Sequence, residues 1–306
     1  MDFHIPGPTM PTTRLERNMN LDDLLPDRTD ALHTLGHVLP DAFDADAALQ
    51  YGGLKGWNLK KAALVADSLA IPDKFAVIRN RGGGLIDSLG IVGPAAKVSQ
   101  NEDLVPLLER LISETGGHFD TAGSFDDGRK VFVSMILPGR RDEIEDHLTV
   151  IDSHDATYSP SVMVTPIHRR TKSLLAFPGN LFRADSADLV SKVYDYLDEL
   201  KELERQMKDT DLPPGTVADV IEREYGPRDD DPKVVATRRE NQVTEIVSLL
   251  GGETPWDGLL ALLEWQDHLS PVRPAGRVVE AKQRARRALL DTKVKGEHLD
   301  RMKGLV

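Results

Sequence analysis

The sequence predicts an α+β protein, with an antiparallel sheet that carries one principal packed helix and a helical C-terminal region after it. Three observations predict this class. Residues 71–183 alternate short β-type segments with hairpin breakers, one helical pattern interrupts them after residue 103, and residues 184–306 are helical throughout. We therefore expect an N-terminal arm at residues 1–30, an α+β core at 31–183 and a helical region at 184–306.

The first 70 residues read as a proline-bearing arm followed by short helical pieces. Pro6, Pro8 and Pro11 lie in a segment without an apolar run, so we expect no secretory signal there. Asp44 is placed to cap a short helix, and Gly52-Gly53 is placed to end it.

The sheet is predicted from β-type segments and the turns between them. Gly82-Gly83-Gly84 and Asp126-Asp127-Gly128 are hairpin breakers. The pair Ser99 and Glu102 has capping-box spacing, and a helical leucine pattern follows it up to Gly116-Gly117. The β-type segments are 75–79, 85–92, 118–124, 130–137, 148–152 and 161–165. The predicted order is β-β-α-β-β-β-β.

The C-terminal region carries helical apolar stripes. The first consists of Leu189, Val193, Tyr196, Leu197, Leu200 and Leu203, and it ends before Pro213-Pro214. A second helix leads to Gly251-Gly252, and a third begins at Thr254, with Trp265 expected in a helix–helix core. The last helix, from about Arg277, is basic.

Composition limits the classes of function. The 306 residues include no cysteine, which excludes disulfides, thiolate metal sites and cysteine nucleophiles and suits a reducing cytoplasm, here that of a bacterial host. No window approaches 18 apolar residues, so we expect no membrane-spanning helix. A net charge of −12 argues against indiscriminate coating of duplex DNA. The charge is uneven, with 15 acidic and 6 basic residues at 184–232 but 9 basic and 4 acidic at 277–303.

Seven cations flank the predicted strands and suggest a groove for nucleic acid. They are Arg79, Arg81, Arg129, Lys130, Arg169, Arg170 and Lys172. If the strands pair, these side chains can gather at the sheet ends and neutralise phosphates. Phe125, Phe132, Tyr158 and Phe177 are candidate stacking faces, although Phe132 fits a core position better. Plain hairpin turns with solubilising side chains are the alternative.

The segment Asp152-Ser153-His154-Asp155 is the strongest candidate for catalysis or metal binding, because it combines two carboxylates, a hydroxyl and an imidazole. Neighbouring residues on a strand point to opposite faces, so they cannot form a Ser-His-Asp triad among themselves. Asp152 and His154 can share a face as two metal ligands, with Asp155, His168 or Asp120 as further candidates. The alternative is a polar strand end whose side chains hold the following turn.

Several short segments, in this order, resemble an uncharacterised family of phage- and plasmid-encoded proteins, known only as a domain of unknown function. They are 33–36, 48–57, 98–102, 119–124 with 128–132, 152–155, 165–168, 238–241, 252–256 and 264–268. The chain departs from the family at Arg169–Ser173, where relatives often have Cys-Gln-Asn. The resemblance implies a mobile-element origin and a link to replication and recombination, but no transferable enzymatic activity.

These observations favour a nucleic-acid-handling accessory protein of a phage or plasmid, of the single-strand-binding or annealing type. The element order with a basic groove is similar to that of phage single-strand-annealing recombinases, an analogy of architecture. We expect DNA binding, a homo-oligomer and no cofactor. One alternative is a metal-dependent enzyme centred on Asp152–Asp155. The other is a structural or host-interaction protein with no catalytic role.

Overall fold

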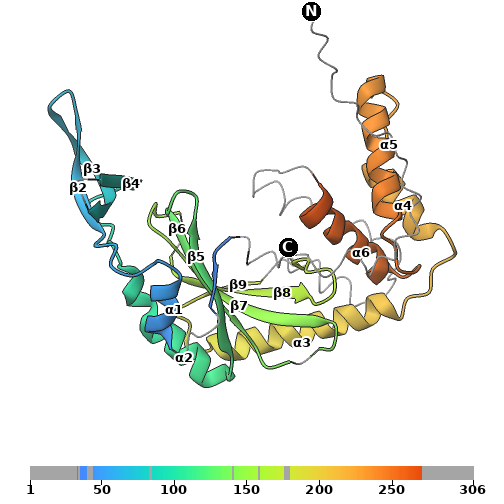
Figure 1. Cartoon of the computed structure of the whole chain (residues 1–306), viewed down its shortest axis with the longest axis horizontal. Helices are drawn as coiled ribbons and strands as arrows, with labels where there is room; N and C mark the ends of the chain where they lie inside the picture. The colour runs from blue at the N-terminus through green and yellow to red at the C-terminus, as the bar shows by residue number, and fades with distance from the viewer. Residues whose placement is uncertain are drawn as a thin grey trace, which may run out of the picture.

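The computed structural model describes residue 33 and residues 35–39, 44–82, 85–139, 141–157, 159–175 and 180–270. Within them the chain forms a six-stranded sheet, a three-stranded sheet and a set of helices (Figure 1). Both sheets are antiparallel, and the helices α3 to α6 follow the last strand, so the predicted α+β class is confirmed. The strands occupy two sheets instead of the single sheet that the sequence suggests.

The six-stranded sheet is an antiparallel meander in the order β1-β5-β6-β7-β8-β9. Its strands are β1 (His37–Val38), β5 (His118–Phe125), β6 (Lys130–Ile136), β7 (Ile144–Ser153), β8 (Ser161–His168) and β9 (Leu181–Arg183). Asp126 and Asp127 have positive φ angles of 55° and 56°, followed by Gly128 at 83°, which is the backbone that a tight β5–β6 hairpin requires. The predicted hairpin at this position is confirmed.

One face of this sheet carries the apolar core. Val131, Val133 and Met135 alternate along β6 and therefore point to one side of the sheet. Val150 and Leu148 of β7, which pair with Val133 and Met135, point to the same side. Helices α1 (Ala45–Tyr51), α2 (Val105–Thr115) and α3 (Leu189–Lys208) contribute to the same apolar cluster and lie beside the sheet (Figure 1). Three helices therefore share the face on which the sequence predicts one principal helix.

Caps define the short helices. The Asp44 carboxylate accepts a hydrogen bond of 2.7 Å from the Ala47 amide, as predicted for the start of α1. A 3-10 turn, η2 (Asn101–Leu104), precedes α2, and there Gln100 donates its amide hydrogen to Asp103 over 2.8 Å. The predicted Ser99–Glu102 capping box is thus shifted by one residue, which releases Ser99 toward β7. Gly116, at φ 70°, ends α2.

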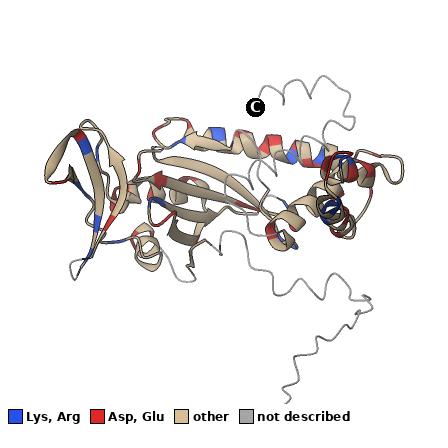
Figure 2. Ribbon diagram, turned by 90° about the horizontal axis from the view of Figure 1, so that it is seen from above, with Lys and Arg blue, Asp and Glu red and all other residues tan. Residues whose placement is uncertain are grey.

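The three-stranded sheet projects from one end of the molecule (Figures 1 and 2). It consists of β2 (Lys60–Ala66), β3 (Leu69–Gly82) and β4 (Leu85–Val92), in that order. The helical pieces predicted before residue 71 do not extend to β2, because residues 60–66 pair with β3 across a turn in which Asp67 and Ser68 have positive φ angles.

The C-terminal helices lie at the other end of the molecule, joined to the core by α3 (Figure 2). The six residues of the predicted α3 stripe are all buried. Beyond it come α4 (Thr216–Tyr225), α5 (Lys233–Val247), α6 (Pro255–Glu264) and a π-helical turn, η3 (Trp265–Leu269). Thr254 and Asp257 cap α6, and Trp265 is 3% exposed in the helical core, as predicted. Helix α4 has no counterpart among the predicted elements.

The apolar cluster continues from the sheet through α3 to α6 without a break at residue 183. The predicted division of the chain at residues 30 and 183 therefore stays a prediction. The N-terminal arm, the basic helix from Arg277, Gly83-Gly84, Tyr158 and Phe177 lie outside the described residues. Within the described part of the chain, no helix combines the length and the apolar character that crossing a lipid bilayer demands.

Candidate ligand pocket at the junction of the two sheets

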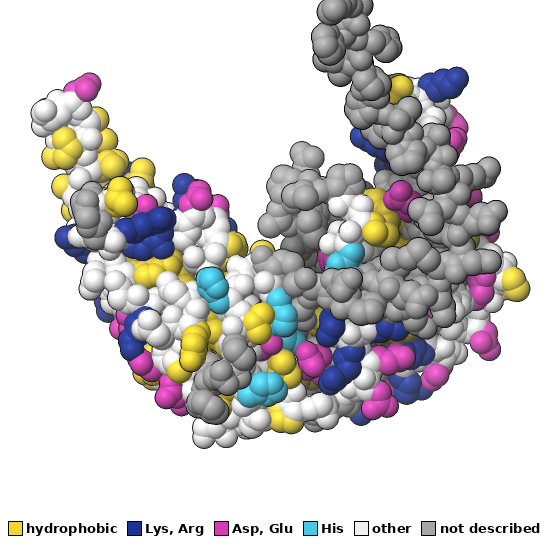
Figure 3. Space-filling model, viewed as in Figure 1, with side chains coloured by type: hydrophobic (Ala, Val, Ile, Leu, Met, Phe, Trp, Pro, Cys, Tyr) yellow, Lys and Arg dark blue, Asp and Glu magenta, His cyan; other side chains and the backbone are white. Residues whose placement is uncertain are grey.

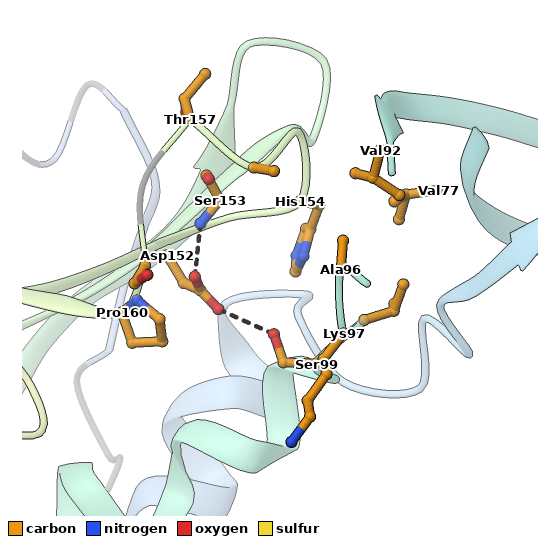
Figure 4. A pocket seen from close by; sticks show the side chains of 13 residues that line it. Val77, Val92, Ala96, Lys97, Ser99, Asp152, Ser153, His154, Thr157 and Pro160 are labelled. Carbon is orange, nitrogen blue, oxygen red and sulfur yellow. Dashed lines mark hydrogen bonds between the residues drawn. The ribbon is translucent and has the colours of Figure 1, made fainter. Parts of the chain in front are cut away.

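A pocket of about 430 Å³ lies where the two sheets meet (Figure 4). Val77 of β3 and Val92 of β4 line one side, and the end of β7 lines the other. The sheets approach closely at Gly90, where an added Cβ would lie 2.5 Å from the Cα atom of Asp155. Only a residue without a side chain permits this approach, so the glycine sets the width of the junction.

Asp152 presents a buried carboxylate to this pocket. It is 2% exposed, and it accepts hydrogen bonds from the Ser153 amide at 2.8 Å and from the Ser99 hydroxyl at 3.3 Å (Figure 4). Burial raises the pKa of Asp152 above its ordinary value, against these two bonds. The carboxylate consequently gains free energy from any further hydrogen-bond donor that enters the pocket.

His154 lies beside Asp152 and is held in one tautomer. Asn101 donates from its Nδ2 to the Leu54 carbonyl at 2.7 Å, which leaves its Oδ1 facing His154 Nε2 at 2.9 Å. His154 therefore carries its proton on Nε2, and Nδ1 is the unprotonated nitrogen. Burial, followed by the charge of Arg79, lowers the pKa of His154 to about 4, so the ring is neutral near pH 7.

The pocket thus combines groups whose pKa values move in opposite directions, a feature that is common at binding and catalytic sites. Two of its polar groups are acceptors, the Asp152 carboxylate and the Nδ1 atom of the neutral His154 ring, whereas the hydroxyls of Ser99 and Ser153 both donate and accept. Lys97 adds one cation on the loop before η2 (Figure 4). Asn101 has no sequence signal for its role, because its partners lie 47 and 53 residues away.

Four of the seven predicted cations belong to segments that meet at this junction, although none of the four lines the pocket itself. Arg79 and Arg81 both bind Asp87, at 2.6 Å and 2.5 Å, and together they hold the pKa of that carboxyl below its usual value. The Arg79 guanidinium also lies 4.0 Å from the centre of the Trp57 ring. In the space-filling view, Lys and Arg side chains gather at the base of the projecting sheet (Figure 3).

The β5–β6 hairpin, which carries Arg129 and Lys130, meets Arg79 at this junction. An added Cβ at Gly128 would lie 3.1 Å from Arg79 Nη1, and the Arg129 carbonyl accepts a 2.7 Å hydrogen bond from the His154 amide. Lys130 pairs with Asp126 at 3.1 Å and lies over the Phe125 ring. Arg129 is exposed and forms no ion pair among the described residues.

The remaining three cations lie at the opposite end of the sheet. Lys130 pairs with Ser153 at one end of β7, and Ile144 pairs with His168 at the other end. Nine residues of strand separate these ends, or roughly 30 Å. Arg169, Arg170 and Lys172 follow His168, and Arg169 contacts Glu145 at 3.3 Å. The expectation that all seven cations line one groove is therefore wrong, because the antiparallel register separates them.

The same strand register separates the residues that the sequence suggests as ligands of one metal ion. Asp152 and His154 line one pocket, but His168 lies at the far end of β7, where its Nδ1 accepts hydrogen bonds from Thr171. Asp120 lies across the sheet, 3.7 Å from His147. Within the described residues, no group of three His, Asp or Glu side chains is arranged to hold a metal ion. Asp152 and His154 stay two predicted ligands without a third.

A polar network that the sequence analysis missed occupies the other face of the six-stranded sheet. His147 is fully buried; its Nδ1 lies 3.2 Å from Ser134 Oγ, and its Nε2 lies 3.2 Å from Glu145. Thr149 and Thr165 bridge neighbouring strands at 2.8 Å. These side chains bind one another within the sheet, which is typical of a network that specifies strand register.

Comparison with protein families finds a match for part of the chain. Residues 88–169 match the model of a domain of unknown function, DUF932, which supports the predicted resemblance to an uncharacterised family. This segment runs from β4 through β8, and it contains every pocket-lining residue except Val77. Neither the curated proteins nor the solved structures contain a match to the chain.

Proposed function

We propose that the protein is a nucleic-acid-handling accessory protein that binds single strands at the junction of its two sheets. The observation that carries the proposal is the contact of Arg79 with the β5–β6 hairpin beside the pocket, where a Cβ at Gly128 would lie 3.1 Å from Arg79 Nη1. This contact brings Arg79 and Arg81, which share Asp87, close to the hairpin that carries Arg129 and Lys130, although about fifty residues separate the pairs in sequence. Phosphate binding requires such a convergence of cations. The binding groups are these four side chains, without the three cations at the far end of β7.

The ion pairs of this cluster leave charge for phosphates. A single carboxylate, Asp87, serves two guanidinium groups, so one positive charge in that trio is not compensated. The side chain of Arg81 is 55% exposed, and Arg129 is exposed without an ion-pair partner among the described residues. The net charge of −12 disfavours indiscriminate binding of phosphates over the rest of the surface.

Fluorescence anisotropy of a labelled single-stranded oligonucleotide, titrated across salt concentrations, tests the proposal. Four phosphate contacts predict that log K falls with log salt at a slope of about −3. Arg81→Ala/Arg129→Ala should lower the affinity at least tenfold and make the slope shallower by about one to two units.

Arg170→Ala/Lys172→Ala is the matched control, since it removes the same charge at the far end of β7. It should leave both affinity and slope close to those of the unaltered protein. If only this control variant bound more weakly, the site would lie at the far end of β7, which would contradict the proposal. A flat titration at low salt would remove the proposal and favour the structural or host-interaction alternative.

The origin and assembly of the protein belong to the same proposal. The resemblance to phage- and plasmid-encoded proteins supports a mobile-element origin and a place in replication or recombination, where a homo-oligomer would bind a strand at several sites. Light scattering of the purified protein tests the oligomer: a mass of one chain of 33.8 kDa would exclude it.

A further inference from the structure

We infer that the junction pocket takes one nucleobase that carries an exocyclic amino group, such as cytosine, from the strand bound beside it. The inference rests on the proposed function for the strand, but the pocket itself is argued from its own geometry. Its volume of about 430 Å³ lies in the range of roughly 300–1,000 Å³ that small-molecule sites occupy.

The shape of the pocket suits a flat heterocycle. Val77 and Val92 offer an apolar side, and the neutral His154 ring lies opposite them (Figure 4). Apolar and aromatic side chains of this kind hold the two faces of an unstacked base, and polar groups then bind its edge. The phosphates on either side of such a base would be available to the four proposed binding groups, Arg79, Arg81, Arg129 and Lys130.

The hydrogen-bonding character selects the class of base. The Asp152 carboxylate is an acceptor, and a carboxylate receives the N4 amino group of cytosine, an interaction common in base recognition. Thymine has a carbonyl oxygen at the corresponding position, which would face the carboxylate without a hydrogen. Burial that raises the pKa of Asp152 acts in the same direction, because an amino donor compensates the buried charge.

Oligo(dC) and oligo(dT) of equal length test the inference, because both are flexible pyrimidine strands that differ at this edge. We expect the unaltered protein to bind oligo(dC) about tenfold more tightly than oligo(dT). Asp152→Asn keeps the acceptor for the Ser153 amide and replaces the other oxygen with a donor, so the preference should disappear or reverse. Arg81→Ala should weaken both strands and keep their ratio.

Equal affinity of the unaltered protein for the two strands, or a preference that Asp152→Asn leaves intact, would overturn the inference while the proposed function stands. If neither strand binds at low salt, the proposed function fails, and the monomers dCMP and TMP then decide the pocket separately. A shift of the His154 ring resonances by dCMP, absent with TMP and in Asp152→Asn, would support the pocket. No shift with either monomer would exclude it.

Discussion

His154 and His168 are two buried imidazoles that the fold holds neutral. Burial is the main cause in both cases, with Arg79 acting on the first ring and Arg170 on the second, and each pKa falls to about 4. His154 binds Asn101 through Nε2, and His168 accepts from Thr171 through Nδ1. The two rings thus lie at opposite ends of β7, and burial keeps both of them neutral.

Acid should destabilise the protein through these two residues. In the unfolded chain each ring takes up a proton below about pH 6.5, whereas the folded protein binds it only near pH 4. The contribution of each neutral ring to the free energy of unfolding is therefore fully present above pH 6.5. It falls toward pH 4 by about 1.4 kcal/mol per pH unit for each ring. Urea unfolding measured across this interval should show the slope.

His154→Gln/His168→Gln is the variant that isolates the effect, since it removes both titrating rings. The slope of its free energy of unfolding against pH should correspond to about two fewer protons taken up on unfolding across the same interval. Asp152 opposes the trend only at the acid end, because its raised pKa makes protonation favourable to the folded state. An unchanged slope in the double variant would show that other groups cause the acid sensitivity.

At the scale of elements, Arg141 connects the sheet to α3. It is 8% exposed and binds Asp146 of β7, and it also contacts Glu204 of α3 at 3.3 Å. Lys208 extends this network from Glu204 to Glu143, where it lowers the pKa of the Glu143 carboxyl. The position of α3 on the sheet therefore depends on buried charges as well as on apolar packing.

Arg141→Met should lower the free energy of unfolding by about 3–5 kcal/mol, because it leaves the buried Asp146 carboxylate without a partner. Arg205→Met offers a matched control on the exposed side of α3, where Arg205 pairs with Glu202 and Asp209 and with no other carboxylate in the part of the chain that the structure describes. That variant should unfold at the same urea concentration as the unaltered protein. Equal losses in the two variants would contradict a special role for the buried network.

At the scale of the whole molecule, one apolar cluster extends from the sheet to the C-terminal helices. Trp57 lies at the junction of the sheets, whereas Trp256 and Trp265 lie in the helical end, and these are the three tryptophans of the chain. The two ends can therefore be observed separately by fluorescence. A continuous core couples their unfolding.

Trp57→Phe and Trp256→Phe/Trp265→Phe should show urea transitions whose midpoints differ only by the stability cost of each substitution, and each variant should also agree with its own circular dichroism transition. Trp57→Phe reports on the helical end and the double variant on the junction. Fluorescence midpoints displaced from the circular dichroism curve of the same variant would indicate that residues 31–183 and 184–306 unfold as separate domains.

Local patterns were sufficient for the elements whose formation depends on neighbouring residues. The Asp126–Gly128 turn, the Asp44 cap, the α3 stripe and the start of α6 at Thr254 are all where the sequence predicts them. Each depends on backbone preference, on capping within three residues or on helical spacing. Asp152 and His154 line one pocket, although His154 already follows the end of β7, so strand alternation alone does not explain their meeting.

The sequence by itself therefore determined the α+β class, most of the elements and the residue types that carry chemistry in this protein. Only the tertiary structure decided which of those residues meet. Strand order and register place Arg79 beside Gly128 but leave Arg170 at the far end of β7, and they bring Asn101 to His154 across 53 residues. Such contacts arise from packing between distant segments, to which no local pattern in the chain is sensitive.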